Sequence, residues 1–170
     1  TTAKTSVDAL KPVPGQTFSL TTGVDTLALT TGDDTVTGTV GTLNATDTII
    51  DNSTTDKDTL TVSLNEAGVK ATIKNIETVN VNWTSNATLD IDATNMTGNT
   101  FNLDATALAF TGNSTFAKVG TNNINAGSKI TGTLIANDIL DSKINAGSAT
   151  TVVVSDTATV PTVGQKTKAN

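Results

Sequence analysis

The segment that decides the fold is a short repeat near the start of the chain. The pentapeptide GVDTL at residues 23–27 returns nine residues later as GDDTV at 32–36, with the common pattern Gly-x-Asp-x-apolar. A second repeat, INAGS, occupies residues 124–128 and again 144–148, twenty residues further on. Fixed short periods of this kind are typical of stacked coils, each too small to bury its own apolar face.

The composition also favours an all-β fold with many turns. Counting along the sequence gives 38 Thr and 17 Asn, and 14 Asp against only 2 Glu. Thr, Val and Ile suit the pleated surface of a sheet, whereas Asn, Asp and Gly suit turns. We expect a β-solenoid, that is a parallel β-helix or β-roll, with its regular part at residues 79–154. A β-sandwich with regularly spaced strands is the alternative.

The chain reads as one domain with short ends. Residues 1–16 contain Pro12 and Pro14 and are expected to be a linker, and residues 165–170 a tail. Within 17–164, residues 17–82 form an acidic half that could bind cations, and 83–164 an Asn- and Thr-rich half of repeated strands. Strict alternation predicts strands at 59–64, 79–83, 89–92 and 101–104. A short helical turn is expected near 65–70.

Several functions are excluded or disfavoured by what the chain lacks. It has no His, Cys or Tyr, and all 10 of its basic residues are Lys. Nucleophiles and metal sites built on Cys or His are therefore impossible. A net charge of −6 argues against nucleic-acid binding. No apolar run approaches the roughly 20 residues of a transmembrane helix, so membrane insertion is not expected.

Clustered short carboxylates are the strongest chemical signal in the chain. The segment 51–58, DNSTTDKD, places three Asp and several hydroxyl groups in eight residues. A hard cation such as Ca²⁺ takes six to eight oxygen ligands of this type. Asx-turns that cap their own backbone are the simpler explanation for any single Asp. As a group we predict Ca²⁺ ligands at seven positions: Asp25, Asp33, Asp34, Asp51, Asp56, Asp58 and Glu77.

The order of these motifs resembles a known family. Residues 21–25, 31–35, 51–60 and 75–81 are similar to the RTX-like repeat regions of surface-layer proteins and large adhesins that Gram-negative bacteria export by type I secretion. The resemblance covers residues 17–105 and implies a calcium-stabilised β-solenoid that forms lattices on the cell surface. In the acidic loop Asn52 and Ser53 stand where that family usually has Gly-Gly.

The sequence therefore predicts a structural, non-enzymatic segment of an extracellular bacterial surface-layer or fibre protein. Its expected partners are copies of itself, assembling in a calcium-dependent way, with a cell-surface polysaccharide as a further candidate. The alternative is a cell-surface adhesin domain that binds a glycan or a protein. A polysaccharide-active enzyme would need facing carboxylates, for which Asp90 and Asp92 lie two residues apart on one strand. Trp83, the single Trp, is expected to be a core or rim residue.

Overall fold

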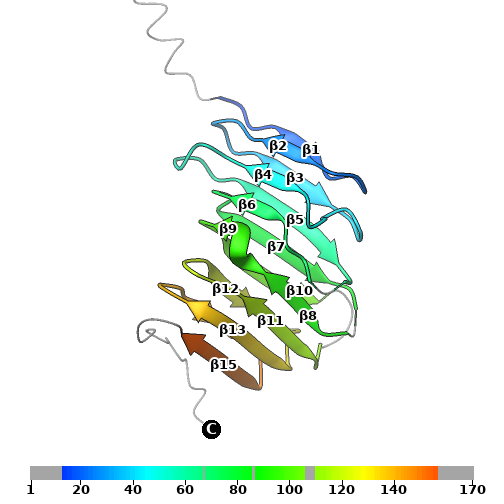
Figure 1. The fold of residues 1–170 in the computed structure, drawn as a ribbon, viewed down its shortest axis with the longest axis vertical. Helices are drawn as coiled ribbons and strands as arrows, with labels where there is room; N and C mark the ends of the chain where they lie inside the picture. The colour runs from blue at the N-terminus through cyan, green and yellow to red at the C-terminus, as the bar shows by residue number, and fades with distance from the viewer. Residues whose placement is uncertain (1–12, 67, 86, 106–109, 157–170) are drawn as a thin grey trace, which may run out of the picture.

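A computed structural model describes residues 13–66, 68–85, 87–105 and 110–156, which wind into an elongated β-solenoid (Figure 1). Each circuit of the chain adds one coil, and every strand pairing in this part of the chain is parallel. The strands are β1 (Thr17–Ser19), β2 (Thr26–Ala28), β3 (Thr35–Gly38), β4 (Thr48–Ile50), β5 (Thr59–Leu64), β6 (Thr72–Lys74), β7 (Thr78–Trp83), β8 (Leu89–Asp92), β9 (Met96–Thr97), β10 (Thr100–Ala105), β11 (Asn113–Ala117), β12 (Asn123–Ala126), β13 (Thr133–Ile139), β14 (Ile144–Asn145) and β15 (Thr151–Asp156).

Three parallel sheets form the walls of the solenoid. Sheet A runs its full length, in the order β1-β3-β5-β7-β10-β12-β14. Sheet B, β2-β4-β6-β9, completes the cross-section in the N-terminal coils, and sheet C, β8-β11-β13-β15, does so in the C-terminal coils. The β-sandwich alternative is wrong, because sandwiches are built from antiparallel strands.

Strand alternation explains why these segments fold in this way. In sheet A the inward position carries Val36, Leu60, Val79, Phe101 and Ile124 in register from coil to coil, each almost fully buried. The outward positions that flank these five residues all carry Thr or Asn. The predicted strands at 59–64, 79–83, 89–92 and 101–104 are confirmed to within one residue. Each coil thus buries its apolar face only against its neighbours.

Aromatic side chains fill the space between sheets A and C. Phe101 and Phe116 lie with ring centroids 5.6 Å apart, and Trp83 meets Phe110 edge-on at 6.2 Å. Trp83 is a core residue, as expected, and its indole nitrogen donates to the carbonyl oxygen of Ala87. This large side chain therefore offers no exposed aromatic surface.

The two sequence repeats correspond to different parts of a coil. The twenty-residue repeat is one complete coil, since Ile124 stacks on Ile144. The nine-residue repeat is half a coil, because residues 23–27 lead into β2 and residues 32–36 into β3 on the opposite wall. Glycine allows close stacking at one corner, where a Cβ on Gly132 would lie 2.1 Å from the carbonyl oxygen of Gly112.

Three boundaries differ from the sequence prediction. Parallel stacking begins at β1, not at residue 79, so the acidic half belongs to the same solenoid. Residues 13–16 join the first coil, with the Gln16 nitrogen donating to Asp34 Oδ1 at 2.5 Å. The expected helical turn is absent from residues 65, 66 and 68–70; a single 3₁₀ turn lies instead at Ala93–Asn95. The predicted tail, and residues 1–12 of the predicted linker, lie outside the described residues.

None of the helical segments in the described ranges has the length and apolar character needed to cross a membrane.

Candidate metal centre

Three carboxylates meet in the loop that joins sheet B to sheet A. Asp51 directly follows β4, Asp58 directly precedes β5, and Asp56 lies between them in the loop. Each offers an oxygen, and these oxygens all lie within 4.8 Å of one another. Asp51 and Asp58 are 1% and 0% exposed, and Asp56 is half-buried. We call these three residues the Asp cluster.

One oxygen of each buried carboxylate in the Asp cluster accepts a hydrogen bond from a backbone amide. Asp51 Oδ2 accepts the amide of Ser53 at 2.6 Å, and Asp58 Oδ1 accepts the amide of Asp34 at 2.8 Å. The remaining oxygens have no hydrogen-bond partner: Asp51 Oδ1, Asp58 Oδ2 and both oxygens of Asp56. Unpartnered buried carboxylate oxygens are costly, and they normally indicate a missing ligand.

Burial and mutual repulsion raise the proton affinity of the Asp cluster. Desolvation raises the pKa of Asp58 to about 6, and Asp51, Asp56 and Asp34 add to the effect, although the Asp34 amide opposes it. The pKa of Asp51 is also raised, mainly by desolvation. The ion pairs Lys70–Asp92 and Lys118–Asp138 do not involve the Asp cluster, and no lysine is among the groups that shift the pKa of Asp51 or Asp58. The site therefore has a deficit of positive charge.

Glu77 lies beside the Asp cluster in the next coil. Its Oε2 accepts the amide of Asp58 at 2.8 Å, and its charge contributes to the raised pKa of Asp51. The structure thus brings Glu77 next to the three Asp residues, but the oxygens that lie within 4.8 Å of one another belong to the Asp residues alone. It adds a fourth negative charge to the same corner of the solenoid.

Asp25 and Asp34 have a different role, which is to close two equivalent turns. Asp34 accepts the amide of Thr30 at 2.6 Å and its hydroxyl at 3.0 Å. Asp25 accepts the corresponding groups of Thr21 at 2.8 and 3.1 Å. The structure therefore places these two predicted ligands at turns, with their oxygens already hydrogen-bonded. Asp33 is exposed, and its Oδ1 accepts the amide of Lys57 at 2.9 Å.

The ligand prediction omitted Asp47, which is buried and structurally important. Its Oδ1 accepts the amide of Asp25 at 2.9 Å, and its Oδ2 accepts the amide of Asn44 at 2.7 Å. The available signal was the motif Asp-Thr-apolar, which recurs at residues 25, 34, 47 and 58. The structure stacks these residues in pairs, Asp25 on Asp47 and Asp34 on Asp58. At Asp34, Asp47 and Asp58 the motif therefore marks a carboxylate that accepts a backbone amide of the preceding coil.

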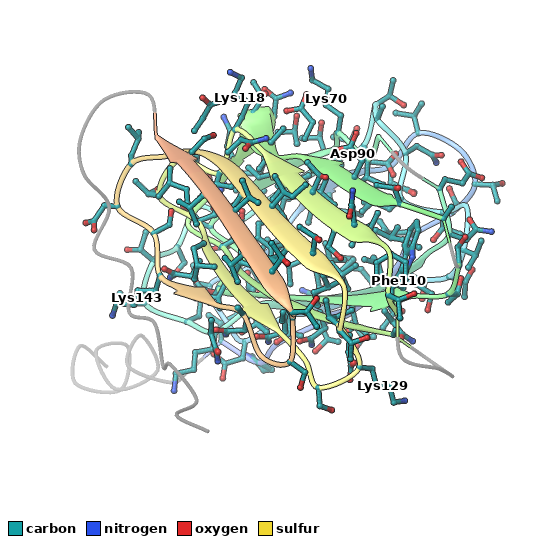
Figure 2. The ribbon with its side chains drawn as sticks, turned by 90° about the horizontal axis from the view of Figure 1, so that it is seen from below. Lys70, Asp90, Phe110, Lys118, Lys129 and Lys143 are labelled. Atoms are coloured by element: carbon teal, nitrogen blue, oxygen red, sulfur yellow. The ribbon has the colours of Figure 1, made fainter. Side chains whose placement is uncertain are left out.

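Asp90 and Asp92 do not form a pair of facing carboxylates with a common partner. Asp92 caps the 3₁₀ turn by accepting the amide and hydroxyl of Thr94, and it pairs with Lys70 at 2.9 Å. The Thr94 hydrogen bonds, followed by Lys70, lower the pKa of Asp92 to about 2. Lys70 and Lys118 project from the same edge of the solenoid (Figure 2). This edge carries structural ion pairs.

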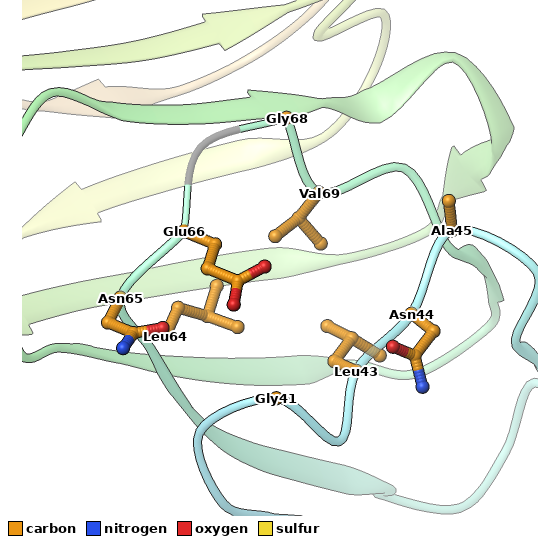
Figure 3. A pocket seen from close by; sticks show the side chains of 9 residues that line it. All are labelled: Gly41, Leu43, Asn44, Ala45, Leu64, Asn65, Glu66, Gly68 and Val69. Atoms are coloured by element: carbon orange, nitrogen blue, oxygen red, sulfur yellow. The ribbon is translucent and has the colours of Figure 1, made fainter. Parts of the chain in front are cut away.

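A small pocket of about 180 Å³ opens next to β5, and the other Glu lies on its rim (Figure 3). Glu66 faces Leu43, Leu64 and Val69, which supply an apolar lining. Asn44 and Asn65 also line the pocket, but Glu66 is its only carboxylate among the described residues. This pocket therefore does not compete with the Asp cluster as a metal centre.

Comparison with known proteins adds no further assignment. No family model, curated protein or solved structure matches this chain. The fold and the Asp cluster, which has the ligand types and spacing to hold a metal ion, are therefore the basis for functional inference.

Proposed function

We propose that this chain is a structural segment of an extracellular bacterial surface-layer or fibre protein, and that Ca²⁺ bound at the Asp cluster stabilises its fold. The observation that carries the proposal is the set of unpartnered oxygens on Asp51, Asp56 and Asp58. A divalent cation would be the missing partner of these oxygens, and its positive charge would offset their negative charge.

The donor set favours Ca²⁺ over other ions. All donors are oxygens, which suit hard cations rather than zinc or copper. Ca²⁺ accepts oxygens in a flexible geometry, whereas Mg²⁺ demands a near-ideal octahedron and loses its waters reluctantly. A loop that brings three carboxylate oxygens within 4.8 Å of one another suits the less demanding ion. Three carboxylates on a loop resemble sites of modest affinity, which are filled at extracellular calcium concentrations.

An ion at this position would tie neighbouring coils together. Asp58 holds the coil before it through the Asp34 amide, and the Asp51 amide donates to the Lys74 carbonyl in the coil after it. Fixing both carboxylates therefore fixes the loop at residues 51–58 between two coils. Because the unfolded chain has no preformed site, the binding free energy becomes folding free energy.

Self-assembly is the second part of the proposal. The coils of a solenoid repeat at a constant spacing along its axis. The end strands β1 and β14 of sheet A each have only one strand neighbour among the described residues. The net charge of −6 on 170 residues gives modest repulsion between copies, which bound Ca²⁺ reduces further. Copies of this chain, or of its parent protein, would then associate into sheets or fibres.

The test compares the chain with calcium and with excess chelator. We expect chelation to lower the melting temperature by about 5–10 °C, since ligand at 100 times its Kd contributes about 2.7 kcal/mol. Light scattering should report larger assemblies only with calcium. An unchanged melting temperature would exclude the ion. A calcium-dependent melting temperature without assembly would retain the ion and reject the lattice.

Two variants sharpen this test. Asp56→Asn removes a charge whose oxygens have no other partner, so it should abolish most of the calcium-dependent shift without disturbing the backbone. Asp90→Asn makes the same chemical change on β8, outside the Asp cluster, and should leave the shift intact. Equal effects of the two variants would show that the Asp cluster does not bind the ion.

A further inference from the structure

A shallow groove crosses the outer face of sheet A, away from the metal centre. It spans β5, β7, β10 and β12 and has a volume of about 430 Å³. One side is a column of Thr61, Asn80, Asn102 and Asn125, which stack in register on consecutive coils. The other side is a second column, Asn82, Asp104 and Gly127.

The first column is an amide ladder. Asn125 donates its Nδ2 to Asn102 Oδ1 at 3.0 Å, Asn102 donates to Asn80 Oδ1 at 3.0 Å, and Asn80 donates to the hydroxyl of Thr61 at 3.2 Å. A carboxamide has two N–H donors and two acceptor lone pairs. Each ladder bond uses one donor and one acceptor, so a rung keeps one of each for a ligand. These groups repeat at the strand spacing of about 4.8 Å.

Gly127 leaves room at one end of the groove because it has no side chain. A Cβ at this position would lie 2.9 Å from the carboxyl group of Asp104. Between the two columns Val81, Leu103 and Ala126 turn their side chains into the core, so the floor is mostly backbone. The result is a preformed trough that runs across the strands. An extended peptide pairs with the edge of a sheet rather than its face, so this trough does not suit strand addition.

Charge narrows the choice of ligand. Of the described residues that line the groove, Asp104 is the only charged one. It is exposed, and its Oδ1 accepts the amide of Ala105 at 2.9 Å. An anionic polymer would be repelled by this carboxylate and by the net charge of −6. A neutral ligand with closely spaced hydroxyl groups would not be repelled, and its hydroxyls could bond to the amide ladder.

We propose that this groove binds a neutral, linear polysaccharide whose sugar rings follow the amide ladder from coil to coil. Vicinal hydroxyls both donate and accept, which matches the free N–H and lone pair of each rung. Trp83 is buried and cannot stack on a sugar, so affinity per chain is low. Repeated copies would raise it by multivalency. The proposal does not depend on the bound cation.

The direct test uses the ¹⁵N-labelled chain with calcium and three probes. Cellohexaose and mannohexaose are neutral, and hexagalacturonate is the acidic comparison. We expect one of the neutral probes to shift the side-chain amide signals of Asn80, Asn102 and Asn125. The signals of Asn44 and Asn95, which lie outside the groove, should not move. Absence of these shifts for both neutral probes, or a stronger response to hexagalacturonate, would overturn the proposal.

Variants then identify the groups responsible. Asn102→Leu removes the central rung and should weaken binding of the responsive probe by about tenfold or more. Thr37→Val changes the same column two coils before Asn80, outside the groove, and should have no effect. Asp104→Lys should retain neutral binding and admit hexagalacturonate. Undiminished binding by Asn102→Leu, checked against the folded amide spectrum, would place the sugar elsewhere.

Discussion

The two halves of the solenoid use different side chains at the same corner. The residue just before each of the first six strands of sheet A forms a column from coil to coil: Gln16, Asp34, Asp58, Glu77, Asn99 and Asn122. In the N-terminal half the column members that accept the preceding backbone amide are carboxylates. In the C-terminal half Asn122 accepts the Asn99 amide at 3.0 Å in the same way.

The difference lies in what each group can do with its second polar atom. Asn122 Nδ2 donates to the carbonyls of Met96 and Val119 at 2.8 and 2.9 Å, so the amide is satisfied within the fold. Asp58 has no donor to offer, and its Oδ2 has no partner. The Asn122 corner is therefore complete on its own, and so is the Asp34 corner, whose oxygens accept the amide and hydroxyl of Thr30. The Asp58 corner is not, and its Oδ2 is one of the oxygens that the proposed cation would bind. Asn99 Oδ1 also has no hydrogen-bond partner.

The largest expected effect comes from placing a carboxylate in the amide half. Asn122→Asp would turn two donated hydrogen bonds into repulsion between a buried carboxylate and the carbonyls of Met96 and Val119. We expect a loss of about 3 kcal/mol or more in the free energy of unfolding, measured by urea denaturation. Calcium should not restore it, because the one group of three or more carboxylates among the described residues is the Asp cluster, which does not include this corner.

The control for this substitution is Asn113→Asp, the same change at an exposed position on β11. It should alter stability by less than about 0.5 kcal/mol. If the two variants are equally stable, the corner amides contribute little. The contrast between the halves would then be lost.

A smaller effect is expected from pH in the calcium-free protein. Asp58 titrates at 3.8 when unperturbed and at about 6 in the fold, so the folded state binds the proton more tightly. Stability from this group is therefore present at low pH and is lost as pH rises through about 6. Between pH 5 and 7 the calcium-free chain should lose about 1 kcal/mol. Its melting temperature should be higher at pH 5 than at pH 7.

Two conditions isolate this pH effect. With calcium the trend should reverse, because protons compete with the ion for the same oxygens. In Asp58→Asn the calcium-free trend should be weakened, since the titrating group is gone. Asp92, whose pKa is lowered to about 2, contributes stability above pH 3.8 and loses it below, so it does not interfere. Persistence of the full trend in Asp58→Asn would assign it to another carboxylate.

Much of this fold was predictable from the sequence because coil geometry imposes a period. The repeats predicted stacked coils, the INAGS period is one such coil in the structure, and alternation predicted β5, β7, β8 and β10. The solenoid boundary at residue 79 was wrong because the early coils vary in length. Corner partners there are 18 residues apart for Gln16 and Asp34, but 24 apart for Asp34 and Asp58. A longer loop at residues 51–58 breaks the period without breaking the stack.

The candidate site was predictable in composition but not in geometry. The segment 51–58 predicted the Asp cluster, because three Asp side chains in one loop repel one another unless a positive charge lies nearby. The sequence could not separate these residues from Asp25 and Asp34, since a turn-closing Asp and an ion-binding Asp have the same local pattern. The two kinds of Asp are distinguished only by the hydrogen-bond partners that each carboxylate finds in the folded chain. The amide ladder was similarly hidden, because its spacing of 22 and 23 residues is set by coil length.

The smallest expected effect tests whether the amide half is independent of the ion. Asn102→Ala would remove its hydrogen bonds to Asn80 and Asn125, both 3.0 Å long and at half-buried positions. Half-exposed cross-strand hydrogen bonds contribute little net stability, so we expect a loss of about 0.5 kcal/mol in urea denaturation. The loss should be the same with calcium and with chelator, because the ladder amides satisfy one another. A larger loss in chelator alone would mean that the ion supports the C-terminal coils as well, and that the two halves unfold as one unit.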